Sequence, residues 1–166
     1  MLIRQARPGV RFVAPAAPGL KTALEEAARN AGLTEGLQIV EGQSHTVLAA
    51  CDVTLIASGT ATLEAALFKR PMVIGYNMNW LSWQLMRRKK LQPWVGLPNI
   101  LCGEFVVPEL LQDDATPEKL SAAVLEWLAA PARISAVQLR FQALHQELRR
   151  DTRALATDAI EKVIQA

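Results

Sequence analysis

Short apolar runs alternate with amphipathic stretches along the first 76 residues of the chain. The apolar runs, rich in β-branched residues, predict strands at 11–14, 37–40, 53–57 and 72–76. Helical spacing predicts helices at about 20–31, 44–50 and 60–69. This alternation indicates right-handed crossovers and a parallel sheet, so we expect an α/β fold built as a Rossmann-like layer sandwich. Run 53–57, almost wholly apolar, is expected to be a central strand buried on both faces.

From about residue 80 the pattern predicts helices only. Thr116 followed by Pro117 and Glu118 is typical of a helix start. A helix that opens at Pro131 carries an apolar stripe over 134–148, which a partner surface is expected to cover, and a last helix is expected at about 151–165. We therefore divide the chain into an α/β region, 1–115, and a helical C-terminal segment, 116–166, that packs on this region or on a partner.

The first residues resemble the end of a helix that leads into the strand at 11–14. A doubly wound sheet usually opens with a strand, and the sequence shows none before this helix. We therefore expect the chain to be a fragment of a longer protein.

Composition narrows the class of protein. The chain has 166 residues, 51% of them hydrophobic, with a net charge of +2, which suits one folded domain and gives no reason to expect nucleic-acid binding. Cys51 and Cys102 lie far apart, and no carboxylate cluster suggests a metal, so neither a disulfide scaffold nor a metal site is expected. No apolar run approaches the roughly 20 residues of a membrane span, and the expected location is cytoplasmic.

The candidate chemistry lies where an apolar strand runs into small residues and a helix begins. Free amides at the helix start and the helix dipole favour an anion there, and Gly59 allows a phosphate to approach the backbone. Hydroxyls of Ser58, Thr60 and Thr62 can add hydrogen bonds. Glu64 lies on the same face as Thr60 one turn later, where a carboxylate suits a ribose diol. The alternative is a Ser or Thr N-cap followed by a solvated Glu.

An ordered set of motifs resembles the lipid-A-disaccharide synthase family. The match extends over essentially the whole chain and is carried by 57–64 (Ala-Ser-Gly-Thr-Ala-Thr-Leu-Glu), 71–76 (Pro-Met-Val-Ile-Gly-Tyr), 97–103 (Leu-Pro-Asn-Ile-Leu-Cys-Gly), 108–112 (Pro-Glu-Leu-Leu-Gln) and 141–145 (Phe-Gln-Ala-Leu-His). The family is a GT-B glycosyltransferase of Gram-negative lipid A biosynthesis. It joins UDP-2,3-diacylglucosamine to 2,3-diacylglucosamine 1-phosphate (lipid X) and releases UDP.

The resemblance implies that this chain is the C-terminal, donor-binding half of a GT-B fold. It places the UDP-sugar on Ser58, Gly59, Thr60, Thr62, Glu64, Asn99 and Gln43. Gln43, with Gly42 and Ser44, is expected to meet the uracil, and Asn99 the donor sugar or phosphate. The alternative for Asn99 is a turn-forming Pro-Asn pair. The resemblance implies no cofactor.

The family's N-terminal acceptor domain, its general base and its Gly-Ser-Arg phosphate motif have no counterpart in this sequence. We therefore expect the isolated chain to lack turnover and name no catalytic residue. His145 is expected to be structural or at the surface, and His45 to start a helix. The expected partners are the donor, lipid X, and the missing domain or a second copy. The competing interpretations are another UDP-sugar GT-B enzyme and a non-catalytic membrane-surface or helix-pairing module.

A basic aromatic segment at 79–94 concentrates three of the four tryptophans and four consecutive cations. Tryptophan prefers the water–lipid boundary, and cations beside it are drawn to anionic headgroups. A membrane-surface role is expected for Trp80, Trp83, Arg87, Arg88, Lys89 and Lys90, which predicts peripheral association with the inner membrane. The alternative is that Trp80, Trp83 and Leu85 pack this helix on the sheet while the cations face water.

Overall fold

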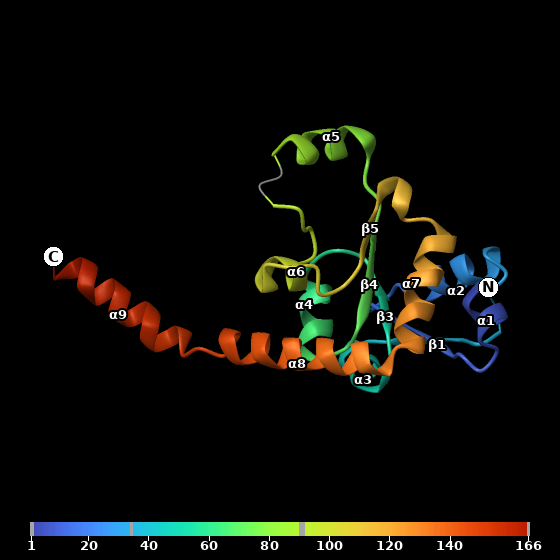
Figure 1. Ribbon diagram of the computed structural model, residues 1–166, viewed down its shortest axis with the longest axis horizontal. Helices are drawn as coiled ribbons and strands as arrows, with labels where there is room; N and C mark the ends of the chain where they lie inside the picture. Colours follow the sequence, from blue (N-terminus) through green and yellow to red (C-terminus); the bar gives the residue numbers. More distant parts are fainter. Residues whose placement is uncertain (1, 34, 90–91, 166) are drawn as a thin grey trace.

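The computed structural model describes residues 2–33, 35–89 and 92–165, and parallel strands alternate with helices through most of them (Figure 1). This confirms the α/β class expected from the sequence. The elements in chain order are α1 (Leu2–Ala6), β1 (Phe12–Ala16), α2 (Lys21–Asn30), β2 (Leu37–Glu41), α3 (Ser44–Ala50), β3 (Thr54–Ile56), α4 (Thr60–Leu67), β4 (Met72–Tyr76), α5 (Trp80–Lys89), α6 (Leu97–Cys102), β5 (Glu109–Leu111), the 3₁₀ turn η1 (Gln112–Asp114), α7 (Pro117–Ala129), α8 (Pro131–Leu148) and α9 (Thr152–Ile164).

The strands form two parallel sheets. β1 pairs with β2, with Phe12 opposite Leu37 and Ala16 opposite Glu41. The second sheet has the order β3-β4-β5, so β4 lies in its centre. Figure 1 shows α4 on one side of β3 and β4 and α7 on the other, the layered arrangement in which crossover helices cover both faces of a parallel sheet.

The hydrophobic core lies around β4. Met72, Val73 and Ile74 are fully buried, and Trp127 of α7 and Phe141 of α8 close on them. The indole Nε1 of Trp127 donates a hydrogen bond to the carbonyl oxygen of Met72 at 3.0 Å, so the largest buried side chain leaves no polar atom without a partner. This core holds β4, the strand that precedes α5, together with α7 and α8.

The stripe on α8 is largely covered by the chain itself. Val137, Phe141 and Leu144 are buried in the core, and Ile134 packs against it. Only its last member, Leu148, is exposed. The expectation that an external partner covers this stripe is therefore wrong, because α4, α6 and α7 supply the contacts.

The prediction that 53–57 forms a strand buried on both faces is also wrong in its burial. Residues 54–56 form β3, but this strand pairs only with β4, and Leu55 is 54% exposed. A second correction concerns the region after residue 80, which contains β5 as well as helices. β5 has three residues and begins with a charged one, so it carries no strand pattern.

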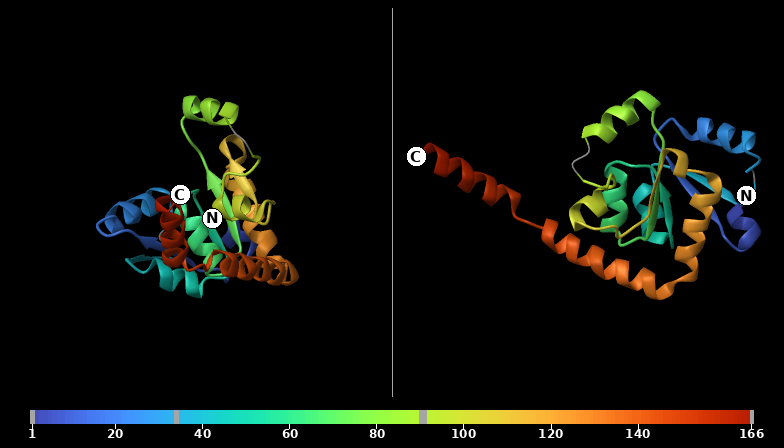
Figure 2. Two further views of the ribbon diagram at one scale, coloured as in Figure 1. Left: turned by 90° about the vertical axis from the view of Figure 1, so that its left-hand side faces the viewer. Right: turned by 45° about the horizontal axis from the view of Figure 1, so that its top comes forward.

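Two helices leave the body of the molecule. α9 extends away from the rest of the chain, and α5 stands apart from the sheets (Figures 1 and 2). Every described residue of α9 is exposed. Among the described helices none is long and apolar enough to cross a bilayer alone. α7 and α8 pass that test together by length and composition, but they are bent by 92° and form part of the core.

Candidate functional site

The amino end of α4 carries no side-chain cap. β3 ends at Ile56, and the chain turns through Ser58 and Gly59 before α4 begins at Thr60. Gly59 adopts φ 122° and ψ −167°, a conformation that L side chains rarely adopt, so the turn requires glycine. Among the described residues no side chain bonds to the first amides of α4, and the first turn of this helix carries no acidic residue. The dipole of α4 therefore points uncompensated positive potential at the surface.

The three hydroxyls of this turn have different surroundings. Thr62 is fully buried, and its Oγ1 donates to the carbonyl oxygen of Gly59 at 2.7 Å, so it holds the turn together. Ser58 is half-buried and Thr60 is exposed. Ser58 and Thr60 can meet a ligand, whereas the burial of Thr62 argues against the direct contact predicted from the sequence.

Glu64 faces the start of α3. Its Oε2 lies 3.9 Å from Nε2 of His45, and its side chain is 45% exposed. The ring of His45 also lies 5.5 Å from the ring of Phe68 at the end of α4, so the two helices meet here. Gln43 directly precedes α3 and is exposed. His45 therefore connects the loop of Gln43 with the face of α4 that carries Glu64. It lies at the start of a helix, as expected.

The loop of Gln43 is held at the end of the first sheet. Gly42 follows β2 with φ 68°, and its N–H donates to the carbonyl oxygen of Ala16, the last residue of β1, at 3.0 Å. The carbonyl oxygen of Gln43 accepts from the N–H of Val47 at 3.0 Å, as the first turn of α3 requires. The loop therefore lies at the carboxyl ends of parallel strands, the edge where ligands bind in open α/β sheets.

Asn99 lies inside the protein. It is 0% exposed on α6, and its Oδ1 accepts from the N–H of Val106 at 2.9 Å and of Val107 at 3.0 Å. Its Nδ2 donates to the carbonyl oxygen of Val107 at 2.9 Å and to Oε1 of Glu109 at 2.8 Å. The amide has no bonding group left for a ligand in this structure, which argues against the contact with donor sugar or phosphate predicted from the sequence.

Glu109 is a residue that the sequence did not single out. Besides Asn99, its carboxylate accepts from the N–H of Val95 and of Gly96, each at 2.8 Å. A half-buried carboxylate that accepts three hydrogen bonds fixes the approach to α6. Glu109 lies in the motif at 108–112, but one acid in an apolar run is too weak a signal to predict such a role.

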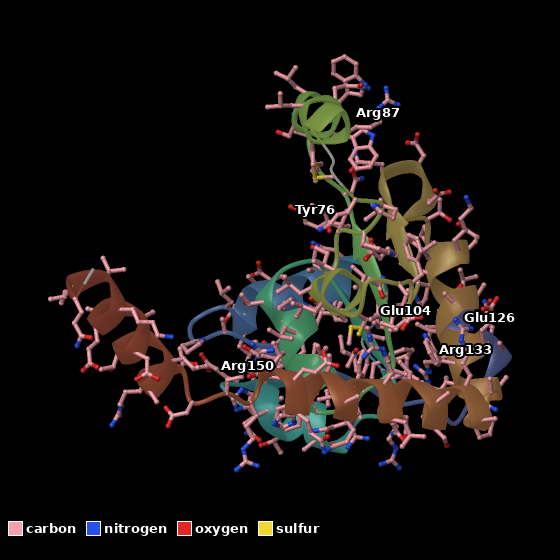
Figure 3. The ribbon with its side chains drawn as sticks, turned by 60° about the vertical axis from the view of Figure 1, so that its left-hand side comes forward. Tyr76, Arg87, Glu104, Glu126, Arg133 and Arg150 are labelled. Atoms are coloured by element: carbon pink, nitrogen blue, oxygen red, sulfur yellow. The ribbon has the colours of Figure 1, made fainter. Side chains whose placement is uncertain are left out.

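The basic aromatic segment forms α5. Trp80 is 70% and Leu81 is 69% exposed, and Leu85 is also exposed, whereas Trp83 is half-buried. Figure 3 shows Arg87 on α5, away from the sheets. Of the alternative in which Trp80, Trp83 and Leu85 pack this helix on the sheet, the exposure of Trp80 and Leu85 argues against two members, whereas Trp83 is half-buried. The side chains of Arg88 and Lys89, and the whole of Lys90, lie outside the described part of the chain.

Three further titratable side chains, those of His145, Cys51 and Cys102, lie outside the candidate site. Nδ1 of His145 lies 2.6 Å from Nζ of Lys69, which joins α8 to α4, in agreement with the structural role expected for His145. Burial raises the pKa of the Cys51 and Cys102 thiols, and both cysteines are free. Within the described residues no group of three or more His, Cys, Asp or Glu side chains is arranged to hold a metal ion.

Known proteins match nearly the whole chain. A family model described as lipid-A-disaccharide synthetase matches residues 2–163. The lipid-A-disaccharide synthase of Albidiferax ferrireducens is 66% identical over 168 aligned residues, that of Verminephrobacter eiseniae 60% over 167, and that of Thiobacillus denitrificans 52% over 167.

These alignments cover 98–100% of this chain but only 43–44% of each relative, so the chain spans less than half of their length. The family match is nevertheless almost complete along the chain itself. The chain belongs to the lipid-A-disaccharide synthetase family.

Proposed function

We propose that this chain is the donor-binding part of a lipid-A-disaccharide synthase. It holds UDP-2,3-diacylglucosamine, from which the whole enzyme transfers diacylglucosamine to lipid X. The observation that carries this proposal is the amino end of α4, which presents amides without a side-chain cap directly after Gly59. Family membership argues against another UDP-sugar GT-B enzyme.

The diphosphate is assigned to the turn at Gly59. The N–H of Thr62 bonds to the carbonyl oxygen of Gly59 at 3.1 Å, which leaves the amides of Thr60 and Ala61 to face an incoming anion. The exposed hydroxyl of Thr60 adds a donor. As UDP leaves, the positive end of α4 stabilises the negative charge that develops on its phosphate.

The nucleoside is assigned to the space between α4 and α3. Glu64 accepts hydrogen bonds from the ribose hydroxyls, and the loop of Gly42, Gln43 and Ser44 meets the uracil. The 3.9 Å approach of His45 to Glu64 supports this assignment, because it puts the loop and the acid within one nucleoside of each other. Asn99 and Thr62 position the surrounding loops.

Transfer of the sugar to the acceptor requires residues that this sequence does not provide. An acceptor hydroxyl, deprotonated by a base outside this chain, attacks the anomeric carbon while the bond to UDP breaks with inversion. We therefore expect the isolated chain to bind donor and to give no turnover.

Calorimetry with UDP tests the donor-site proposal. The chain should release or absorb heat on titration with UDP, and Glu64→Ala should weaken binding about tenfold or more, because it removes charge-assisted hydrogen bonds to the ribose. Glu25→Ala is the matched control, since Glu25 is also half-exposed and also lies 3.9 Å from a partner, Lys21. Absence of UDP binding would favour the non-catalytic module, and equal weakening by both substitutions would contradict the role of Glu64.

We further propose that the enzyme works at the cytoplasmic face of the inner membrane and meets it through α5. The exposed Trp80, Leu81 and Leu85 give this helix an apolar surface that no other part of the described chain covers. The cations at 87–90 follow on the same segment. Diacylated substrates reside in a bilayer, which gives an enzyme of this class a reason to carry such a surface.

A further inference from the structure

Two polar residues of the 108–112 motif bond to the chain on the two sides of α5. Glu109 begins β5, and Gln112 begins η1. The chain leaves the layered body after β4, forms α5 and returns before α6 (Figure 1). Gln112 bonds to the leaving segment and Glu109 to the returning one. Neither side chain takes part in the proposed donor site.

The side-chain amide of Gln112 continues the pairing of β4 with β5 beyond the point where the backbone ladder ends. The last backbone pair is Tyr76 opposite Leu111. Two residues after Tyr76, the N–H of Met78 donates to Oε1 of Gln112 at 2.7 Å. Nε2 of Gln112 donates in return to the carbonyl oxygen of Met78 at 3.0 Å. Met78 is therefore held through both of its backbone groups, as a neighbouring strand would hold it.

The backbone of Gln112 adopts an unusual conformation. Its φ is 51°, and in the described part of the chain Lys69 is the other non-glycine residue with a positive φ. The left-handed region is unfavourable for a residue with a Cβ and persists where the surrounding structure requires it. The carbonyl oxygen of Gln112 also accepts from the N–H of Ala115 at 2.9 Å. Gln112 is thus fixed in the turn that leads into α7.

The residue that Gln112 holds leads directly into α5. Asn79 follows Met78, and its Oδ1 accepts from the N–H of Leu81 at 2.9 Å. The carbonyl oxygen of Asn79 accepts from the N–H of Trp83 at 3.0 Å. These bonds cap the first turn of α5. Because α5 stands apart from the sheets (Figure 2), its direction depends on how the chain is held where it leaves the body.

Glu109 holds the chain on the other side of α5. Its carboxylate oxygens accept from the N–H of Val95 and of Gly96, each at 2.8 Å. A Cβ at Gly96 would lie 2.3 Å from Cδ1 of Ile74 and 3.1 Å from Oε1 of Glu109, so the returning chain passes directly against β4 and the carboxylate. Ile74 is fully buried and pairs with Glu109 in the sheet. The returning chain is therefore fixed to the core.

We propose that Glu109 and Gln112 are positioning residues that together fix the direction in which α5 leaves the body. Two attachments at the end of one strand prevent α5 from turning about a single hinge. β3, β4 and β5 are parallel, so α5 leaves from the edge of the sheet that carries the Gly59 turn. The functional consequence rests on the membrane role proposed above: a fixed α5 holds the donor site at a constant height over the bilayer.

Distances between two spin labels test the proposal on the 166-residue chain. Ser82→Cys on α5 and Ala122→Cys on α7, both at exposed positions, carry the labels. The free Cys51 and Cys102 are replaced with serine. Gln112→Gly removes the attachment and suits the left-handed backbone at this position, so the fold should be kept. The distribution of distances should become at least about twofold wider.

Lys69→Gly is the matched control. Lys69 also has a positive φ, 57°, and its Nζ also makes two hydrogen bonds, to the carbonyl oxygen of Leu67 and to Nδ1 of His145. These bonds join α4 to α8, so their loss should leave the width unchanged. Glu109→Gln is the second test variant. It replaces one accepting oxygen with an amide N–H and should also widen the distribution.

An unchanged width in Gln112→Gly or in Glu109→Gln would overturn the two-point attachment. Equal widening by Gln112→Gly and Lys69→Gly would also overturn it, because the effect would then be a general loosening of the fold.

Co-sedimentation with anionic vesicles separates this inference from the membrane role. Gln112→Gly leaves the exposed side chains of α5 in place, so its binding should stay within about threefold of that of the unaltered chain. An unaltered chain that failed to bind would contradict the membrane role, whereas the widths measured in solution would still decide whether Glu109 and Gln112 position α5.

Discussion

The Asn99 amide holds together a loop that no regular secondary structure supports. Four hydrogen bonds join it to Val106, Val107 and Glu109, and the side chain is fully buried. The resemblance carried by the Leu-Pro-Asn motif made Asn99 a candidate ligand contact. Its partners lie seven to ten positions away, on the irregular segment before β5 and at the first residue of β5, so no periodicity could predict them.

Asn99→Ala should lower the free energy of unfolding by about 2–3 kcal/mol, because it removes four hydrogen bonds and leaves the buried N–H of Val107 without its acceptor. Denaturant unfolding measures this, with Asn79→Ala as control. Asn79 is exposed and accepts one hydrogen bond, from the N–H of Leu81, so its loss should cost about 1 kcal/mol or less. If Asn99→Ala instead abolished UDP binding while stability stayed unchanged, Asn99 would contact the ligand directly.

The Gly59 turn, in contrast, could be predicted from local sequence. A strand, a glycine and a helix start follow one another within a few residues, and each has its own pattern. Helical spacing also predicted that Glu64 lies on the same face as Thr60 one turn later, and both residues belong to α4. The approach of His45 was not predictable, because it depends on how α3 and α4 pack.

At the scale of elements, β4 and α7 pack closely against each other. A Cβ at Gly75 of β4 would lie 2.8 Å from Cδ2 of Leu120 on α7, so the strand approaches the helix only because this position has no side chain. The four strands predicted from apolar runs all exist. The burial of β3 was misjudged because a local pattern does not reveal which neighbouring strands are present.

Gly75→Ala should destabilise the protein by about 1–3 kcal/mol, since the added methyl overpacks the contact with Leu120. Adding Leu120→Val should recover part of the loss. Gly9→Ala is the control, because no atom lies within 4 Å of a Cβ there. Thermal or denaturant unfolding gives the comparison, and equal effects of Gly75→Ala and Gly9→Ala would show that α7 does not pack on β4 as described.

At the scale of the whole molecule, α5 projects from the layered body and offers apolar and cationic groups together (Figure 1). The body also carries the candidate donor site at the carboxyl ends of its strands. A membrane-bound α5 would keep this site close to a lipid-linked donor. Sequence composition suggested the membrane role, and the exposure of Trp80 and Leu85 weakens the alternative in which these side chains pack on the sheet.

Vesicle co-sedimentation tests this role. Replacing the four cations at 87–90 with Gln should weaken binding to anionic vesicles on the order of 1,000-fold, since each cation near the surface contributes about 1 kcal/mol. The matched control replaces Arg149, Arg150, Arg153 and Lys162, four cations in the exposed C-terminal part of the chain, and should bind as the unaltered protein does. Binding that is unaffected by the change at 87–90 would count against α5 as the membrane contact.

The central claim is that the uncapped amino end of α4 binds a diphosphate. Titration with UDP, followed through backbone amide resonances, measures this directly, because the starts of α7 and α9 carry side-chain caps and serve as controls. Thr116 accepts from the N–H of Lys119 at 3.2 Å, and Asp151 accepts from the N–H of Ala154 at 3.1 Å. The amides of Thr60 and Ala61 should shift on addition of UDP while those of Lys119 and Ala154 stay in place. Unmoved resonances at Thr60 and Ala61, or equal shifts at all three helix starts, would contradict the account.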